Sequence, residues 1–169
     1  MRSVEFEVRR MIEDDWDRYR AIRLEMLADT PSAFGETLSA AEARDEAAWR
    51  DRLAASQADS SARFAAVLAS GDWVGAMGGY LDLNLGPVLV GVYVVHRFRG
   101  DGRGVTSALM GAVEDWARGH ASSIRLDVHE SNARARKAYA KRGYVETGHT
   151  HPYPLDPTHF EVEMVKQLR

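Results

Sequence analysis

A glycine-rich turn directly after the most apolar segment constrains this chain more than any other feature. Residues 88–95 read Val-Leu-Val-Gly-Val-Tyr-Val-Val, and residues 99–104 read Arg-Gly-Asp-Gly-Arg-Gly. Apolar residues at helical spacing follow from Val105 to Ala117, which predicts a strand, a tight turn and a helix. Glycines let backbone N–H groups converge at the positive end of the helix dipole, so the turn is a candidate anion site. Gly91 inside the strand predicts a bulge or a close backbone approach.

The rest of the chain alternates strand and helix patterns without a linker or an internal repeat. Alternating apolar residues predict a first strand around Val4 to Val8, and two helices are expected from Glu13 through Leu27 and over 39–55. Further strands are expected at 63–69, 73–83, 124–129, 144–147 and 160–168, with a short basic helix at 132–142. This order predicts one α/β domain over residues 1–169, built on a mixed sheet with helices on both faces.

Composition and charge exclude several classes of function. The absence of cysteine excludes disulfides, thiolate zinc sites and cysteine nucleophiles. The longest apolar run is too short to cross a bilayer and the N-terminus has no apolar signal core, so we expect a cytoplasmic protein without a membrane partner. A net charge of −3 argues against nucleic acid. Two basic segments, 96–105 and 132–142, indicate either a site for a small polyanionic ligand or solvated helix faces, and charge alone does not decide between them.

A second motif follows the glycine-rich turn after about thirty residues, and both together identify a family. Leu126-Asp-Val-His-Glu-Ser-Asn132 is followed by Tyr139 and by Gly143-Tyr144. With residues 92–104, this motif resembles the acetyl-CoA-binding motifs of the GCN5-related N-acetyltransferase (GNAT) superfamily, closely over residues 88–148. The resemblance implies a single acetyltransferase domain. Its mixed, mostly antiparallel sheet of about seven strands would splay apart after the strand at 88–95.

The resemblance also implies where acetyl-CoA binds. The pyrophosphate is expected on the backbone amides from Gly100 to Val105, and pantetheine beside the strand on main-chain groups of residues 92–94. Asn132 is expected to contact pantetheine, to cap the following helix, or to do both. Arg134, Arg136 and Lys137 are candidates for the 3′-phosphate. The implied cofactor-binding residues are Val92, Tyr93, Val94, Arg99, Gly100, Asp101, Gly102, Arg103, Gly104, Val105, Asn132 and Tyr139.

The implied reaction is direct acetyl transfer to an amine within a ternary complex, because no cysteine is present to form an acyl-enzyme. A lysine-like amine has a pKa near 10.4, so only about one molecule in a thousand is neutral near pH 7.4. Catalysis therefore needs deprotonation, proximity and stabilisation of an oxyanion. By resemblance, a main-chain N–H near Val94 polarises the thioester carbonyl, and Tyr139 protonates the departing thiolate. Aromatic packing is the alternative role for Tyr139.

The general base is open to several assignments. Asp127 lies five residues before Asn132, where ribosomal-protein alanine acetyltransferases carry a glutamate, so the resemblance favours Asp127. This role requires its side chain to face the acceptor, between the inward-packing Leu126 and Val128. The alternatives are Glu36, Asp82, His129, Glu130 or a water chain without a dedicated base.

The sequence also bears on the acceptor, on metal binding and on the oligomeric state. Residues 1–60 hold 9 arginines and 14 acidic residues, which favours a cationic acceptor, either a small amine or a peptide N-terminus. A late loop containing Pro152, Tyr153 and Phe160 is expected to form a wall of the acceptor pocket. Its histidines lack metal-ligand spacing, so no metal is expected. A non-catalytic acyl-CoA sensor is the alternative function, and the resemblance suggests a homodimer.

Overall fold

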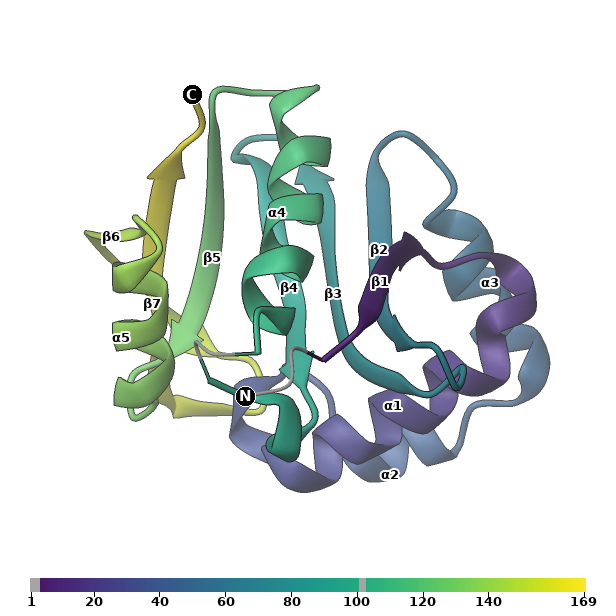
Figure 1. The fold of residues 1–169 in the computed structure, drawn as a ribbon. Helices are drawn as coiled ribbons and strands as arrows, with labels where there is room; N and C mark the ends of the chain where they lie inside the picture. The colour runs from purple at the N-terminus through teal and green to yellow at the C-terminus, as the bar shows by residue number, and fades with distance from the viewer. Residues whose placement is uncertain (1–3, 101–102) are drawn as a thin grey trace.

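The computed structural model describes residues 4–100 and 103–169, which form a seven-stranded sheet with the order β1-β2-β3-β4-β5-β7-β6 (Figure 1). Every neighbouring pair is antiparallel except β4 and β5, which are parallel. The mixed, mostly antiparallel sheet expected from the resemblance is therefore confirmed. The strands are β1 (Phe6–Arg10), β2 (Ser61–Leu68), β3 (Trp73–Asp82), β4 (Gly86–Val94), β5 (Ser123–His129), β6 (Val145–Tyr153) and β7 (Asp156–Gln167).

Helices cover both faces of this sheet, as the sequence predicts. Consecutive strand residues point to opposite faces, and Ala65 and Ala66 of β2 accordingly belong to two different apolar clusters. The cluster with Ala66 contains Leu109 of α4, whereas the cluster with Ala65 contains Trp49 of α3. Within the described part of the chain, no helix is long and apolar enough to span a membrane. The helices are α1 (Trp16–Asp29), α2 (Leu38–Glu42), α3 (Glu46–Ala55), α4 (Val105–Arg118) and α5 (Ala133–Lys141).

Two expected elements differ in the structure. The single helix expected over 39–55 is two helices, because Asp45 starts α3 by accepting a hydrogen bond from the backbone N–H of Ala48 at 2.9 Å. The late loop is largely a hairpin, since β6 extends to Tyr153 and β7 begins at Asp156. Two register shifts interrupt the pairing of these strands. Because each shift changes which face of the sheet the following side chains point to, apolar and polar residues do not alternate regularly along the sequence. Pro152 is tolerated because β6 is an edge strand.

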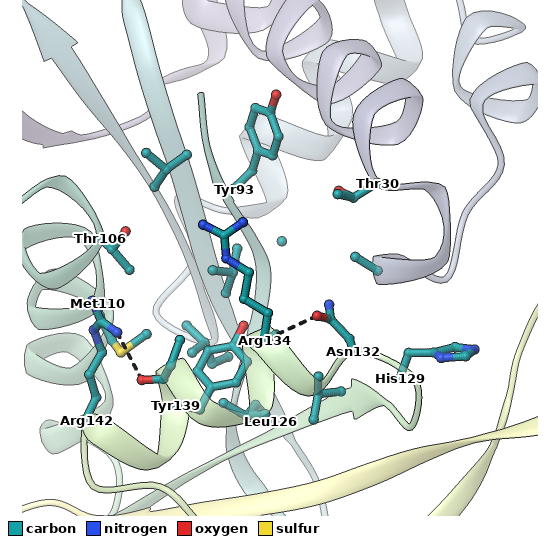
Figure 2. Close-up of a pocket in the computed structure, with 18 of the residues that line it drawn as sticks. Thr30, Tyr93, Thr106, Met110, Leu126, His129, Asn132, Arg134, Tyr139 and Arg142 are labelled. Atoms are coloured by element: carbon teal, nitrogen blue, oxygen red, sulfur yellow. Dashed lines mark hydrogen bonds between the residues drawn. The ribbon is translucent and has the colours of Figure 1, made fainter. Parts of the chain in front are cut away.

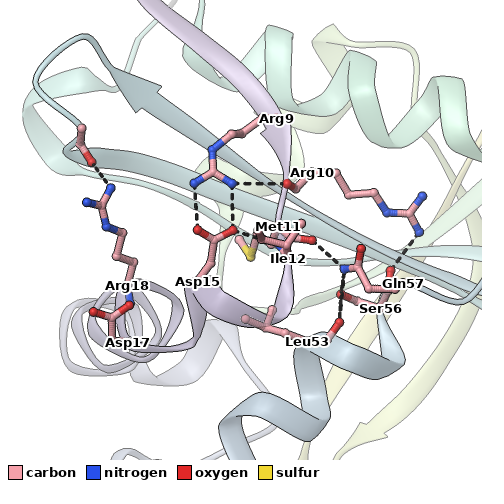
Figure 3. A network of polar contacts seen from close by, with 11 residues as sticks. Arg9, Arg10, Met11, Ile12, Asp15, Asp17, Arg18, Leu53, Ser56 and Gln57 are labelled. Carbon is pink, nitrogen blue, oxygen red and sulfur yellow. Dashed lines mark hydrogen bonds and ion pairs between the residues drawn. The ribbon is translucent and has the colours of Figure 1, made fainter.

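A polar network fastens the α1–α3 layer to the sheet (Figure 3). Arg9 of β1 donates two hydrogen bonds of 2.8 Å to the carboxylate of Asp15, which precedes α1. Gln57, just after α3, donates from Nε2 to the Met11 carbonyl at 2.6 Å. Burial opposes ionisation of Asp15, but the hydrogen bonds from Arg9 and from the backbone N–H of Ile12 outweigh it and lower the pKa of Asp15.

The sheet splays apart between β4 and β5. Val88 and Arg125 form the one register pair between these strands. Beyond it, Val90 lies opposite Gly78 and Tyr93 lies opposite Ala76, so β4 carries one extra residue and is bulged. Gly91 sits in this bulge with φ at +62°, which an L-residue adopts only with strain. The predicted bulge and splay are confirmed, and they open a wedge in the middle of the sheet.

Candidate active site

A groove of about 710 Å³ occupies this wedge (Figure 2). Its walls are β4 over residues 89–94, β5 over 126–129, α5, the first turns of α4 and the loop after α1. Thr106 and Met110 of α4 also line it, although in the sequence they occupy ordinary helix positions that carry no sign of a site. The expected site residues that line the groove are Val92, Tyr93, Val94, Arg99, Gly100, Asp127, Asn132 and Tyr139.

The glycine-rich turn lies at the α4 end of this groove. Gly100 and Gly104 have φ values of +105° and +74°, and Gly104 is the N-cap residue of α4. Only glycine adopts such angles without strain, which explains why the turn needs this residue type. Arg103, Gly104 and Val105 do not line the groove, and Val105 is fully buried whereas Arg103 is exposed. Asp101 and Gly102 were also expected to bind the cofactor, but they lie outside the described residues.

Arg99 lines the groove and also donates hydrogen bonds that hold the end of β4 in place. Its Nε donates to the Val94 carbonyl at 2.7 Å, and its Nη2 donates to Asp29 at 2.6 Å. The backbone N–H of Val95 donates to Val74 of β3. Because main-chain groups alternate in direction along a strand, those of Val94 point away from β3 and into the wedge. Arg99 therefore anchors the end of β4 while the Val94 amide faces the groove.

Basic side chains dominate the groove lining on the α5 side. Asp127 is the only acidic residue among the described residues that line the groove. Arg136, expected as a candidate for the 3′-phosphate, is absent from the lining and is paired with Glu146 at 2.6 Å. The groove is therefore suited to a ligand that carries several negative charges. Its basic residues are Arg99, Arg134, Lys137, Lys141 and Arg142.

Tyr139 of α5 and Asn132, the residue that caps this helix, project towards the groove (Figure 2). The side-chain oxygen of Asn132 accepts from the backbone N–H of Ala135 at 3.1 Å, so Asn132 caps α5 and keeps its amide NH₂ for another partner. Burial raises the pKa of Tyr139 to about 12, although the charge of Arg142 opposes the shift. Tyr139 therefore keeps its proton at neutral pH and remains a proton donor.

Asp127 lies on the sheet face opposite α4. Its neighbours Leu126 and Val128 are buried in the cluster that contains α4, whereas the Asp127 side chain is 39% exposed. Burial raises the pKa of Asp127, and the nearby Glu163 carboxylate raises it further, against opposing charges on His151 and Arg125. This orientation is the one that the base assignment requires.

The alternative carboxylate bases have other partners. Burial raises the pKa of Glu36, but hydrogen bonds and charges from arginines outweigh it and lower that pKa. Asp82 accepts from two backbone N–H groups in the β3–β4 turn. Glu130 contacts His159 at 3.1 Å. His129 does line the groove, with its Nδ1 held 2.7 Å from the Ser131 hydroxyl.

A histidine and two carboxylates meet beside the groove. His151 Nε2 lies 3.6 Å from an oxygen of Asp127 and 3.6 Å from an oxygen of Glu163. One ligating atom from each of these residues falls within 4.8 Å of the others. The three residues come from three strands and share no characteristic spacing, so no sequence pattern predicts this grouping.

The β6–β7 hairpin is joined to the loop after α1. The Tyr153 hydroxyl donates to the Phe34 carbonyl at 2.7 Å, and Tyr153 is buried. Phe34 and Thr30 both line the groove. Pro152, Tyr153 and Phe160 themselves do not line the groove, so the hairpin contacts it only through this loop.

A strand bulge, a splayed parallel pair and a glycine turn at a helix start define a fold of the acetyltransferase class. The model of the Acetyltransferase (GNAT) family matches residues 11–144. The chain belongs to this family, and a family of this kind transfers acyl groups from acetyl-CoA. No curated protein matches the chain in sequence.

Solved structures share the whole fold at low sequence identity. A GNAT acetyltransferase from Streptococcus pneumoniae has a TM-score of 0.80 and 18% identity, over 98% of this chain and 100% of the other. A ribosomal-protein-alanine N-acetyltransferase from Brucella melitensis has a TM-score of 0.76 and 19% identity, over 96% and 99%. The putative acetyltransferase yncA from Salmonella typhimurium, solved with acetyl-CoA, has a TM-score of 0.75 and 16% identity, over 98% and 95%.

Proposed function

We propose that this chain is an acetyl-CoA-dependent N-acetyltransferase that acts as a single cytoplasmic domain. It moves the acetyl group to a primary amine by direct attack in a ternary complex. The single observation that supports this best is the wedge between β4 and β5, which ends at a glycine turn and is lined by basic residues. No metal, nucleic acid or membrane takes part in this proposal, and the protein is proposed to form a homodimer.

The cofactor-binding residues divide by the part of acetyl-CoA that they contact. Main-chain N–H groups from Gly100 to Val105 hold the pyrophosphate at the start of α4, where the helix dipole favours negative charge. Main-chain groups of residues 92–94 bind pantetheine as an added strand, because the β5 side of β4 is open there. The amide NH₂ of Asn132 contacts the same moiety.

The two proposed catalytic side chains act on different groups, Asp127 on the attacking amine and Tyr139 on the leaving thiolate. Asp127, directly or through a water molecule, takes a proton from the amine, whose nitrogen then attacks the thioester carbon. The Val94 N–H stabilises the oxyanion of the tetrahedral intermediate. As the carbon–sulfur bond breaks, the Tyr139 hydroxyl supplies the proton, or a hydrogen bond, to the leaving thiolate. The raised pKa of Tyr139 keeps this proton available.

The acceptor is proposed to be a small cationic amine, with a peptide N-terminus as the second candidate. Asp127 and Glu161 give the β5–β7 surface a negative charge that would attract an ammonium group, whereas Glu163 is buried and paired with Arg125. The similarity in fold to a ribosomal-protein-alanine N-acetyltransferase keeps the peptide in consideration.

An acetylation screen tests the proposal. The protein is incubated with ¹³C-acetyl-CoA and with panels of amines, antibiotics and peptides, and products are identified by mass spectrometry alongside release of free CoA. We expect at least one amine to be acetylated. Binding of acetyl-CoA by calorimetry without turnover on any amine would favour the sensor, and no binding of acetyl-CoA would contradict both functions.

A further inference from the structure

We infer that the acceptor carries a carboxylate or a similar oxyanion close to its amine, and that an arginine cluster beside the active site binds it. The arginine cluster consists of Arg23, Arg44, Arg52 and Arg63. This inference rests on the proposed function and specifies the acceptor for the same site.

The arginine cluster has a large excess of positive charge. Glu36 is its one close carboxylate among the described residues, and three of the four arginines share it. Arg23 donates to Glu36 from Nε at 3.0 Å and from Nη2 at 2.9 Å, Arg52 lies 3.5 Å away, and Arg44 is also in contact. Four guanidinium groups around one carboxylate leave a formal charge of +3.

Arg63 is the member that most needs an anion. Its Nε is buried without a hydrogen-bond partner, and its other guanidinium nitrogens donate to no residue in the described part of the chain. Its guanidinium lies over the ring of Tyr19 at 5.3 Å. Burial lowers the pKa of Arg63, and the charges of Arg52 and Arg23 lower it further. A buried donor without a hydrogen-bond partner is costly, and Arg63 Nε is such a donor at the edge of a cluster with excess positive charge. An anionic ligand that completes the cluster explains this arrangement.

The position of the arginine cluster connects it to the reaction centre. Arg63 extends across β3 over Gly78, where a Cβ atom would lie 3.3 Å from Arg63 Cγ and 3.7 Å from its Nη1. Arg23 Nη1 lies 3.8 Å from where a Cβ atom of Gly91 would be. Gly78 and Gly91 belong to neighbouring strands, which are about 4.8 Å apart. The arginine cluster therefore ends at the bulge of β4 that lines the groove.

The two sides of the acceptor region carry opposite charges. Asp127 and Glu161 project from β5 and β7, and burial raises the pKa of both carboxylates. An amine that enters here meets negative groups, while the rest of its molecule meets the arginine cluster. A zwitterion such as an amino acid, with an amine and a carboxylate a few bonds apart, matches this polarity. A polyamine would place positive charge against the arginine cluster.

The first test measures anion binding without turnover. Sulfate is titrated against thermal unfolding with saturating CoA present, which occupies the pyrophosphate site, and with chloride at matched ionic strength. Arg63→Met keeps the length of the side chain but removes the charge. Arg118→Met, at the end of α4 on the other face of the sheet, is the control. We expect sulfate to raise the melting temperature of the wild type and of Arg118→Met by more than that of Arg63→Met.

The same variants separate a ligand-binding role from a structural one. Without sulfate, we expect Arg63→Met to unfold at a temperature equal to or above the wild type, because it removes a buried donor that has no hydrogen-bond partner and lowers the excess positive charge of the cluster. A lower melting temperature together with an unchanged response to sulfate would assign Arg63 to packing and overturn the inference.

The second test compares acceptors in matched pairs. Free amino acids and the corresponding amino-acid amides are supplied as acceptors, and initial rates give kcat/KM. We expect the carboxylate form to exceed its amide by about thirtyfold, the effect of losing one partner of a buried charge pair. Arg63→Met should remove this preference mainly through a higher KM, and Arg118→Met should retain it.

The outcomes distinguish failure of this inference from failure of the proposed function. Acetylation of amides or polyamines in preference to amino acids would overturn the inference and leave the N-acetyltransferase intact. If no amine were acetylated, the proposed function would fail, and the sulfate titration would still decide whether the arginine cluster binds an anion.

Discussion

The glycine in the β4 bulge provides a direct test of how the fold opens its groove. Gly91 has φ at +62° and lines the groove. Gly91→Ala places a methyl group there and forces an L-residue into the left-handed region. We expect this substitution to lower both the stability of the protein and its affinity for acetyl-CoA.

The magnitude follows from the local geometry. Left-handed backbone costs an L-residue about 1–2 kcal/mol. The new Cβ would lie 3.8 Å from Arg23 Nη1, which is ordinary van der Waals contact and adds no clash. Alanine also lowers the conformational entropy of the unfolded chain, which stabilises the folded state by about 0.4–1 kcal/mol and offsets part of this cost. The net loss in free energy of unfolding is therefore about 1 kcal/mol, which lowers the melting temperature by about 2–4 °C.

The matched control is Gly86→Ala at the start of the same strand. Gly86 has φ at +76°, and the nearest atom to its new Cβ would be Ala121 Cβ at 4.0 Å. The backbone strain is the same, but Gly86 does not line the groove. Chemical denaturation should show similar losses for both variants. Calorimetry should show weaker acetyl-CoA binding for Gly91→Ala alone.

Strain in Gly91→Ala can be relieved if β4 straightens and the wedge narrows. The loss of affinity is limited by the strain that is relieved, so about 1–2 kcal/mol corresponds to about a five- to thirtyfold higher Kd. Wild-type affinity in Gly91→Ala, at reduced stability, would refute the reasoning that the bulge shapes the pantetheine site.

Four further substitutions test the active site and the framework. Tyr139→Phe should lower kcat by about 10²-fold or more, as expected for a lost general acid, with the acetyl-CoA Kd unchanged in calorimetry. The pKa of Asp127 is raised, so as a base it becomes competent only as pH rises through that value, and Asp127→Asn should abolish this acid limb of the pH–rate profile; an identical profile would exclude Asp127. Gly79→Ala should cost about 1–3 kcal/mol or more in denaturation, since its Cβ would lie 2.5 Å from the ring of Trp116. The pKa of Asp15 is lowered, so its stabilisation is present above the unfolded value of about 3.9 and is lost as pH falls through the folded value. Asp15→Asn should therefore be less stable than wild type by about 1–2 kcal/mol at pH 7, and chemical denaturation should show this difference shrinking as pH falls below about 3.9.

Features set by local sequence could be predicted. The strand at 88–95, the glycine turn and the α4 pattern are each encoded in consecutive residues, so their order and the fold class follow from periodicity. The β4 bulge could be predicted as well, because a glycine weakens the interior of an apolar strand unless the backbone bulges or is closely approached there. Asn132 as a cap needs only its position before α5.

Features that depend on distant pairing could not be predicted in the same way. The break between α2 and α3 depends on one capping side chain, Asp45, inside a pattern that otherwise continues as a helix. The β6–β7 hairpin contains register shifts that erase its alternation. Asp127, His151 and Glu163 meet only because β5, β7 and β6 are neighbours in the sheet, an order that no local pattern encodes.

The net charge of a segment likewise does not predict which charges lie next to a bound acceptor, because that depends on where each side chain lies in the fold. Residues 1–60 carry a net charge of −5, and this sum favoured a cationic acceptor. In the fold, Glu13, Asp14 and Asp17 are exposed to solvent, whereas Arg23 is buried beside the β4 bulge. Charges in solvent are screened over about 8–10 Å, while charges at a partly buried site act at close range on whatever binds there. The carboxylate that we infer on the acceptor therefore meets the arginine cluster, while its ammonium group, before deprotonation, meets Asp127 and Glu161.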